Sequence, residues 1–407
     1  MINQTVIFII GRYANGGVAR RATTIANELG RFGCKIILLA TRGVGDDVFF
    51  ARSQHVKLVS LPEYTAKYTA SGSDPKESRE QERQLKFWKR LGYVTSWCPP
   101  IARQVKYNIR GLRRSADLRS FLKVHAGATL IPFGMSYYED TYFAAKGLGC
   151  KIIYAERNAS QVENPVSSPF HVCTNRVLRR ANGAVFQTYD ELSFYGNSHI
   201  SNAVVIRNPL SPTLPHPFEG ERRPVIVNFC RLSPQKNLPL LIEAFLLIQK
   251  DHPEYRLEIY GNAVTSEEEK LRMELQDMVS ARRAEDQIKI LPPVAHVHDL
   301  VRDCAMFVSS SDFEGLSNSM LEAMAIGLPC VCTDCLGGGA REMIQDGVNG
   351  LLVPMNDVQA LAGAMKRLIK EPALAQSCSK NAIAVRKSLA VETIAGQWWN
   401  LIQRVQG

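Results

Sequence analysis

The stretch SSSDFEGLSNSMLEAMAIGLP, residues 309–329, decides how this chain folds. An apolar run over Ala305–Ser309 predicts a buried strand, and Glu314 lies in the loop that follows it. Ser317 is a residue type that favours a helix N-cap, whereas Gly327, closely followed by a proline, favours a helix end. The sequence therefore predicts a strand, a loop and a helix in succession, with the free backbone amides of the helix start pointing into a ligand cleft.

The same alternation of short apolar runs and longer helix-like stretches covers most of the chain. One series extends from residue 5 to about 206, a second from residue 225 to 353, and the pattern is helical after that. Such alternation predicts parallel strands joined by helical crossovers. The apolar runs that indicate strands include Lys35–Ala40, Ala128–Ile131, Ile152–Ala155, Ala184–Gln187, Val225–Phe229 and Arg256–Tyr260.

A proline-rich polar segment, NPLSPTLP at residues 208–215, separates the two series. A chain of 407 residues is also too long for one compact domain and suits two. We therefore expect an α/β protein with two Rossmann-like, doubly wound domains that face a central cleft. The expected divisions are a first domain over residues 1–207, a linker over 208–222, a second domain over 223–390 and a helix over 391–407.

The helix at residues 391–407 carries Trp398 and Trp399. It is long enough to pack across to the first domain. Burial within its own domain is an equally open alternative.

Two pairs of charged residues lie in loops of the second series. Glu314 precedes the helix of the opening stretch and Glu322 lies about one turn inside it, so the two carboxylates can reach different parts of one ligand. Arg231 and Lys236 stand five residues apart in a loop between a strand and a helix start. Two such cations can neutralise a leaving diphosphate from two directions. Taken alone, the two glutamates are better explained as a charged loop and a solvated helix face, and the two cations could equally be an ordinary surface pair.

These motifs resemble the retaining GT-B glycosyltransferase family (group 1, glycosyltransferase family 4-like), which includes bacterial enzymes of capsule, lipopolysaccharide and lipid-linked glycan synthesis. Glu314 and Glu322, separated by seven residues, match its Glu-x7-Glu signature in DFEGL and EAMA. The resemblance implies that Glu314 contacts donor-sugar hydroxyls and that Glu322 binds the ribose. It also implies that Arg231 and Lys236, in CRLSPQKN, bind the donor diphosphate.

Further parts of the resemblance concern the rest of the donor site. We expect Gly315, Leu316 and Ser317 at the helix start to bind the donor. The turn TDCLGGGARE, residues 333–342, resembles the family's glycine-rich turn, although a structural role for each glycine is as plausible. Cys230 stands where the family usually has Gly.

In the first domain, the resemblance places Gly16 and Gly17 in a glycine-rich loop near the donor phosphates and the acceptor. Arg20 and Arg21 follow that loop. Glu156 stands where many relatives carry a catalytic His. It is a candidate catalytic residue that either positions the acceptor or pairs with Arg157.

Charge is concentrated in the first half of the chain. Residues 1–210 hold 29 Lys and Arg against 15 Asp and Glu, and the remainder holds 20 against 24. Between Arg83 and Lys123 there are eleven basic residues and one acidic residue, with aromatic residues interleaved. This pattern favours docking on an anionic membrane, and buried aromatics below a solvated basic face are the alternative. No nucleic-acid-binding motif accompanies the basic residues.

Other features restrict the cell compartment and the cofactors. The apolar run at residues 5–10 is too short for a signal peptide or a membrane span, so we expect a cytoplasmic protein, peripheral on the inner face of the cell membrane. Cys330, Cys332 and Cys335 are the one cluster among ten cysteines, and no fourth metal ligand lies near them in the sequence. We expect no metal and no cofactor.

The resemblance implies transfer of a sugar from a nucleotide diphosphate donor, of the UDP-hexose or UDP-N-acetylhexosamine kind, to a glycan or lipid-linked acceptor. A nucleotide-sugar epimerase or hydrolase of the same shape is one alternative. A non-catalytic nucleotide-sugar-binding protein is another, although every donor-contacting residue type is present.

Overall fold

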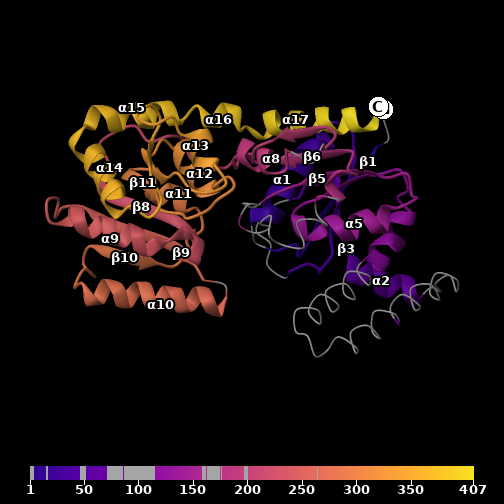
Figure 1. The fold of residues 1–407 in the computed structure, drawn as a ribbon, viewed down its shortest axis with the longest axis horizontal. Coiled ribbons are helices and arrows are strands. Elements are labelled where there is room, and N and C mark those ends of the chain that lie inside the picture. The colour runs from indigo at the N-terminus through magenta and orange to yellow at the C-terminus, as the bar shows by residue number, and fades with distance from the viewer. Residues whose placement is uncertain are drawn as a thin grey trace.

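A computed structural model describes residues 4–14, 17–45, 52–70, 86, 115–157, 162, 175, 177–196, 200–263 and 265–407. Figure 1 shows two α/β domains side by side, with the yellow C-terminal helix lying along the top of the first domain. The two parallel sheets confirm the fold class predicted from the alternating pattern.

The first sheet is parallel and has the strand order β3-β2-β1-β4-β5-β6-β7. From β1 the chain adds β2 and β3 on one side, and then continues with β4 on the other side of β1. All five residues from Val6 to Ile10 in β1 are fully buried, since helices cover both faces of the sheet. Its strands are β1 (Thr5–Ile10), β2 (Lys35–Ala40), β3 (Val56–Ser60), β4 (Thr129–Pro132), β5 (Lys151–Ala155), β6 (Gly183–Phe186) and β7 (Ala203–Val205).

The second sheet is also parallel, with the order β10-β9-β8-β11-β12-β13. The first strand of this domain, β8, therefore lies at the centre, between β9 and β11. The strands are β8 (Arg223–Arg231), β9 (Arg256–Asn262), β10 (Ile288–Leu291), β11 (Cys304–Ser309), β12 (Cys330–Thr333) and β13 (Leu351–Val353).

Helices connect the strands and cover both sheets. In the first domain they are α1 (Gly17–Arg31), α2 (Leu61–Ala70), the 3₁₀ turn η1 (Met135–Tyr137), α5 (Tyr138–Ala145) and α8 (Tyr189–Phe194). In the second they are η3 (Pro234–Lys236), α9 (Leu238–Gln249), α10 (Ser266–Ala281), α11 (Val297–Val301), α12 (Asn318–Ala325), α13 (Gly339–Met343), α14 (Val358–Lys370), α15 (Pro372–Ala382), α16 (Val385–Ser388) and α17 (Val391–Gln406).

Helix α17 packs on the first domain, which decides between the two alternatives left open by the sequence (Figure 1). Trp398 is fully buried, with its ring centroid 6.3 Å from those of Phe8 and Phe133. Trp399 stacks on Phe32 at the end of α1, with ring centroids 5.7 Å apart. The chain therefore crosses between the domains twice, once after β7 and once between α16 and α17.

Most of the basic, aromatic segment 83–123 lies outside the described residues; residue 86 and residues 115–123 are inside them. Phe121 is buried in the core of the first domain, 5.1 Å from the ring of Tyr64. This aromatic ring is thus a core residue and not available to a membrane surface. No helix in the described ranges has the length and apolar character needed to cross a bilayer.

Candidate functional site

Two loops of the second domain are tied together at the carboxyl ends of β8 and β11. These strands are parallel neighbours, so the loops that leave them lie side by side. The Asp312 N–H donates to the Gln235 carbonyl oxygen at 2.9 Å, and the Asn237 side-chain amide donates to the Asp312 carboxylate at 2.8 Å. The loop that carries Lys236 is thereby fixed against the loop that carries Glu314.

Lys236 and Glu314 form an ion pair in which each side chain is only 14% exposed. Burial alone lowers the pKa of Lys236, but the adjacent Glu314 carboxylate more than reverses this, so the pKa lies above its ordinary value. Lys236 is consequently a cation at neutral pH. The two residues are 78 positions apart in the sequence, and we expected both in the donor site. The structure brings them into contact.

Arg231 is oriented differently from Lys236. Its Nε lies 3.1 Å from a carboxylate oxygen of Glu268 at the start of α10, and its side chain is 59% exposed. Arg231 therefore pairs outside the Lys236–Glu314 contact. The two cations of this loop do not converge on one point in this structure.

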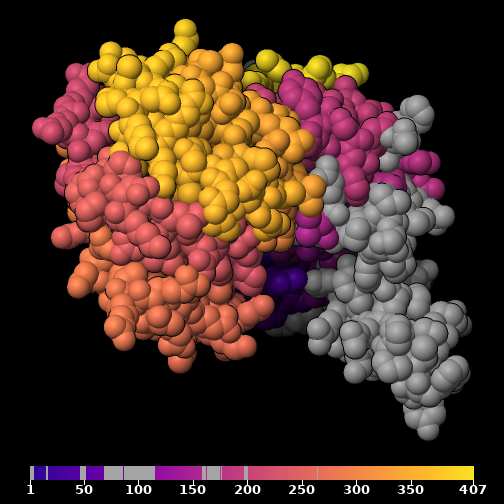
Figure 2. Space-filling model, turned by 60° about the vertical axis from the view of Figure 1, so that its left-hand side comes forward, coloured from indigo at the N-terminus to yellow at the C-terminus, as the bar shows by residue number. Residues whose placement is uncertain are grey.

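Both carboxylate oxygens of Glu322 have protein partners. Arg20, in α1 of the first domain, donates to Oε1 at 2.8 Å, and His298 Nε2 lies 2.9 Å from Oε2. Burial raises the pKa of Glu322, but the hydrogen bond from His298 and the charge of Arg20 outweigh it and bring the pKa below its ordinary value. Glu322 is thus an anion that bridges the two domains. Figure 2 looks into the hollow between the domains, with indigo atoms of the N-terminal segment at its floor.

The start of α12 faces the first domain directly. Ser317 is the N-cap residue, as predicted, although its side chain makes no capping hydrogen bond. The Leu316 N–H donates to the Gln187 side-chain oxygen at 3.3 Å. Asn318 accepts a hydrogen bond from Asn208 at 3.4 Å. One of the amides expected to be free for a ligand is therefore occupied by a side chain of the first domain.

The glycine-rich turn sets the position of Glu314 and Gly315. A Cβ atom on Gly337 would overlap the Glu314 carbonyl, and one on Gly339 would overlap the Gly315 carbonyl. Gly337 also has a φ of +95°, which other residues rarely adopt. The Glu314 N–H donates back to the Leu336 carbonyl oxygen at 2.9 Å. A close backbone approach therefore requires glycine at both positions.

On the first-domain side, Gly17 is the first residue of α1, and Gly16 lies outside the described residues. A Cβ atom built on Gly17 would lie 3.4 Å from Arg21 Nη2 and 3.6 Å from Asn318 Nδ2. Gly17 therefore lies where α1 of the first domain meets the start of α12 of the second, a contact region that we call the seam. The position predicted for the glycine-rich loop adjoins the start of α12.

Glu156 is buried at the carboxyl end of β5, and its Oε1 accepts the Arg157 N–H at 2.7 Å. The Arg157 guanidinium instead lies over the Phe133 ring, 3.9 Å from its centroid, and donates to Asn208 at 3.3 Å. Burial, reinforced by the charge of Glu156, raises the pKa of nearby Glu191 to about 8. Glu156, Arg157 and Glu191 thus form a buried charged cluster in the first domain.

The three clustered cysteines are buried, and burial raises the pKa of each thiol. Cys330 donates to the Leu328 carbonyl oxygen at 3.3 Å. Among the residues with a described placement, no three His, Cys, Asp or Glu side chains gather as metal ligands would. These cysteines contribute to the core as protonated thiols.

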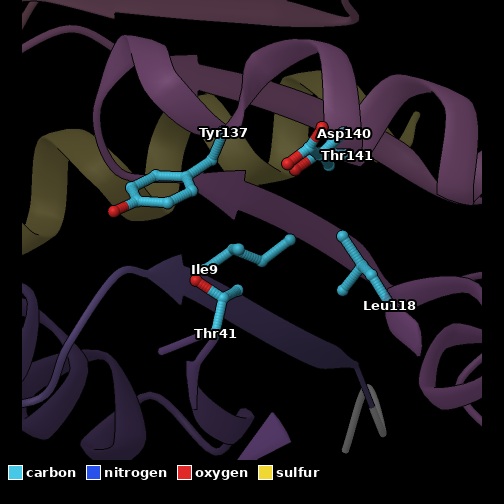
Figure 3. A pocket seen from close by; sticks show the side chains of 6 residues that line it. All are labelled: Ile9, Thr41, Leu118, Tyr137, Asp140 and Thr141. Atoms are coloured by element: carbon cyan, nitrogen blue, oxygen red, sulfur yellow. The ribbon is translucent and has the colours of Figure 1, made fainter. Parts of the chain in front are cut away.

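A separate small hollow opens in the first domain (Figure 3). Tyr137 and Thr41 lie on opposite sides of it, with Ile9 between them. The remaining lining residues are Leu118, Asp140 and Thr141. None of the candidate residues named above lines this hollow.

Sequence reasoning missed several residues of this site, among them His298 and Gln187. His298 and Gln187 contact Glu322 and Leu316 across 24 and 129 residues of sequence, respectively. His298 stands in the short helix α11 and Gln187 directly follows β6. Only the position of Gln187 at the carboxyl end of a strand could have indicated it.

Comparison with known proteins agrees with this arrangement. Residues 215–385 match the family described as glycosyl transferases group 1. The chain is 34% identical over 172 residues to the exopolysaccharide phosphotransferase SCO2592 of Streptomyces coelicolor, a match that covers 42% of this chain and 18% of that protein. It is 26% identical over 193 residues to the poly(glycerol-phosphate) alpha-glucosyltransferase of Bacillus subtilis, covering 47% of this chain and 27% of that one.

Each of these matches spans less than a third of the curated relative. Among solved structures, a TarM variant of Staphylococcus aureus in complex with Fondaparinux, alpha-GlcNAc-glycerol and UDP superposes with a TM-score of 0.73. That likeness has 13% sequence identity and covers 98% of this chain and 99% of TarM, so it concerns the fold. Residues 215–385 of this chain are therefore similar to the glycosyl transferases group 1 family, and the molecule has the GT-B fold.

Proposed function

We propose that this protein is a retaining glycosyltransferase. It transfers a hexose or N-acetylhexosamine from a UDP-sugar to a glycan or lipid-linked acceptor in cell-surface polysaccharide synthesis. The observation that carries the proposal is that Glu322, in a segment that matches the group 1 glycosyltransferase family, pairs with Arg20 of the first domain, while Glu314 pairs with Lys236. TarM, a protein of the same fold, has been crystallised with UDP and a GlcNAc-glycerol.

In the proposed reaction, Glu314 binds hydroxyls of the donor sugar and Glu322 binds the ribose. The acceptor hydroxyl oxygen forms its bond to the anomeric carbon on the face from which the diphosphate leaves. The hydroxyl proton passes to the leaving phosphate oxygen. Lys236 exchanges its partner Glu314 for the diphosphate, whose developing charge it stabilises together with Arg231 and backbone amides of the loop before α12. Glu156 is assigned to the acceptor side as a buried positioning residue that does not touch the acceptor hydroxyl.

Variants of the two glutamates test this assignment. Glu322→Ala should raise the KM for the donor about 10- to 100-fold, since a charged hydrogen bond contributes roughly 1.5–3 kcal/mol. Glu314→Ala should mainly lower kcat, because its sugar contact acts in the transition state. Glu274→Ala, which removes an exposed carboxylate from α10, is the matched control. Kinetic constants unchanged from those of the wild type in both site variants would contradict the assignment.

The same assay addresses the rival functions and the metal. Wild-type protein should consume the donor only when an acceptor is present, whereas a hydrolase or epimerase would not need one. Activity should persist in EDTA, because cations of the chain neutralise the diphosphate in this mechanism. Loss of activity in EDTA and its recovery with Mn²⁺ or Mg²⁺ would refute the metal-free mechanism.

We also propose that basic residues between Arg83 and Lys123 hold the first domain on an anionic membrane. Each basic side chain near such a surface contributes about 1 kcal/mol. The protein should therefore co-sediment with phosphatidylglycerol liposomes at low salt and not with neutral liposomes. Replacing Lys86, Lys89 and Arg90 with Glu should abolish this binding and leave nucleotide affinity unchanged. Equal binding to both kinds of liposome would exclude the idea.

A further inference from the structure

Arg21 differs from the other cations near the seam. Lys236 pairs with Glu314, Arg20 with Glu322 and Arg231 with Glu268. Arg21, half-buried in the first turns of α1, makes no side-chain hydrogen bond or ion pair with any residue that the structure describes. A guanidinium held in a protein without a partner is unfavourable unless a ligand supplies the opposite charge.

The guanidinium of Arg21 borders a space that glycine keeps open. The point where a Cβ of Gly17 would stand lies 3.4 Å from Arg21 Nη2 and 3.6 Å from Asn318 Nδ2. Asn208 donates to the side-chain oxygen of Asn318, which orients the Asn318 amide so that its NH₂ group is directed toward Gly17. Two nitrogen donors, one from each domain, therefore flank the same position. A ligand oxygen stands farther from the Gly17 Cα than a Cβ would, and the missing side chain lets it approach both donors.

The electrostatic surroundings of Arg21 relate this space to both carboxylates of the site. Burial lowers the pKa of Arg21 to about 10, and the charges of Glu322 and Glu314 both oppose that shift. Arg21 is therefore within electrostatic reach of both glutamates and stays protonated at neutral pH. In the proposed function, Glu322 holds the ribose and Glu314 the sugar. The diphosphate is the part of the donor that connects these two groups.

We propose that Arg21 is a ligand of the donor diphosphate, supplied by the first domain. The inference rests on the proposed function and extends it. The Arg21 guanidinium donates two parallel N–H bonds to phosphate oxygens, and the Asn318 amide donates from the opposite domain. Lys236 then binds the diphosphate from the second domain. The nucleotide is held from both sides of the seam, so binding of the diphosphate draws the two domains together.

Affinities for UDP and for uridine test the proposal, because uridine lacks the phosphates. Arg21→Gln should weaken UDP binding about 10- to 100-fold in calorimetry and leave the weak competition by uridine unchanged. Arg31→Gln removes a 70% exposed arginine from the other end of the same helix and should change neither affinity. Because Arg21 has no hydrogen-bond or ion-pair partner to lose among the described residues, Arg21→Gln should keep the melting temperature of the protein measured without nucleotide. Arg21→Lys, which keeps the charge without the paired donors, should lie between wild type and Arg21→Gln.

The outcomes separate the two proposals. UDP affinity unchanged in Arg21→Gln and Arg21→Lys, with tight binding by the wild type, would overturn the role of Arg21 and leave the proposed function intact. Equal weakening of UDP and uridine would also overturn it, since that would indicate a general effect on the site. A wild-type protein that binds none of UDP, GDP, ADP and CDP would overturn the proposed function itself.

Discussion

At the scale of single residues, charge is arranged in pairs that a ligand can rearrange. Lys236 and Glu314 neutralise each other, and Glu322 is held by Arg20 and His298. Lys236 and Glu322 keep their charge because their partners more than compensate for the effect of burial on the pKa of each. A charged ligand that binds here exchanges these partners, and no side chain has to become ionised on binding.

Glu191 offers a test of the buried charged cluster that it forms with Glu156 and Arg157. Its folded-state pKa of about 8 lies above the ordinary value of 4.5, so the folded protein holds a proton that the unfolded chain releases. The free energy of unfolding should therefore fall as the pH rises between these two values, by up to about 1.4 kcal/mol per pH unit. Glu191→Gln cannot titrate and should flatten this slope in denaturant unfolding between pH 5 and pH 8.

Glu274→Gln is the control for that experiment, because this side chain is 57% exposed on α10 and should leave the slope unchanged. Identical pH slopes for wild type and Glu191→Gln would mean that Glu191 is ionised in the folded state.

The sequence was informative about residues that follow strands. Glu314 and Lys236 each stand just beyond a strand end, and neighbouring parallel strands bring such loops together. The partner of each side chain was less predictable. Arg231 pairs with Glu268, whose position depends on where α10 packs. Contacts such as those of His298 and Gln187 depend on tertiary packing, which no local pattern encodes.

At the scale of elements, α17 acts as part of the first domain although it follows the second. Trp398 fills the space between Phe8 and Phe133 on one face of the first sheet. The length of the helix and its two tryptophans were readable from the sequence. Its destination was not, because an amphipathic helix fits either domain equally well until the available faces are known.

Two neighbouring tryptophans distinguish core packing from surface packing on this helix. Trp398→Ala should lower the free energy of unfolding by about 3–5 kcal/mol, because the ring is fully buried. Trp399→Ala should cost about 1 kcal/mol, since its partner Phe32 is 44% exposed. Urea unfolding followed by circular dichroism measures both. Similar losses for the two variants would argue against burial of α17 on the first domain.

At the scale of the whole molecule, polar contacts hold the domains in one relative orientation. Glu342 in α13 accepts the Tyr189 N–H and lies 3.0 Å from Arg207. Arg341 reaches Asp190 at 3.3 Å. Together with Arg20–Glu322 these contacts surround the seam, so a change in domain orientation would break several at once.

Removal of Glu342 should loosen this arrangement. Glu342→Ala leaves Arg207 and the Tyr189 N–H without this acceptor. The free energy of association between the two domains should weaken by roughly 1–3 kcal/mol. The radius of gyration in small-angle X-ray scattering should increase. Glu243→Ala breaks an ion pair with Arg282 inside the second domain and should leave the radius unchanged. A radius in Glu342→Ala equal to that of the wild type would show that the apolar contacts suffice.

The route of α17 also has a consequence for synthesis on the ribosome. Phe8 emerges early, whereas Trp398, which covers it, is translated nearly 400 residues later. Until then the first domain has one face of its sheet incompletely covered, so it cannot reach its final stability as an independent unit during translation. The second domain, whose strands and covering helices are nearly contiguous in the chain, has no such delay. Completion of the early-made domain is thus tied to synthesis of α17, which follows the whole second domain.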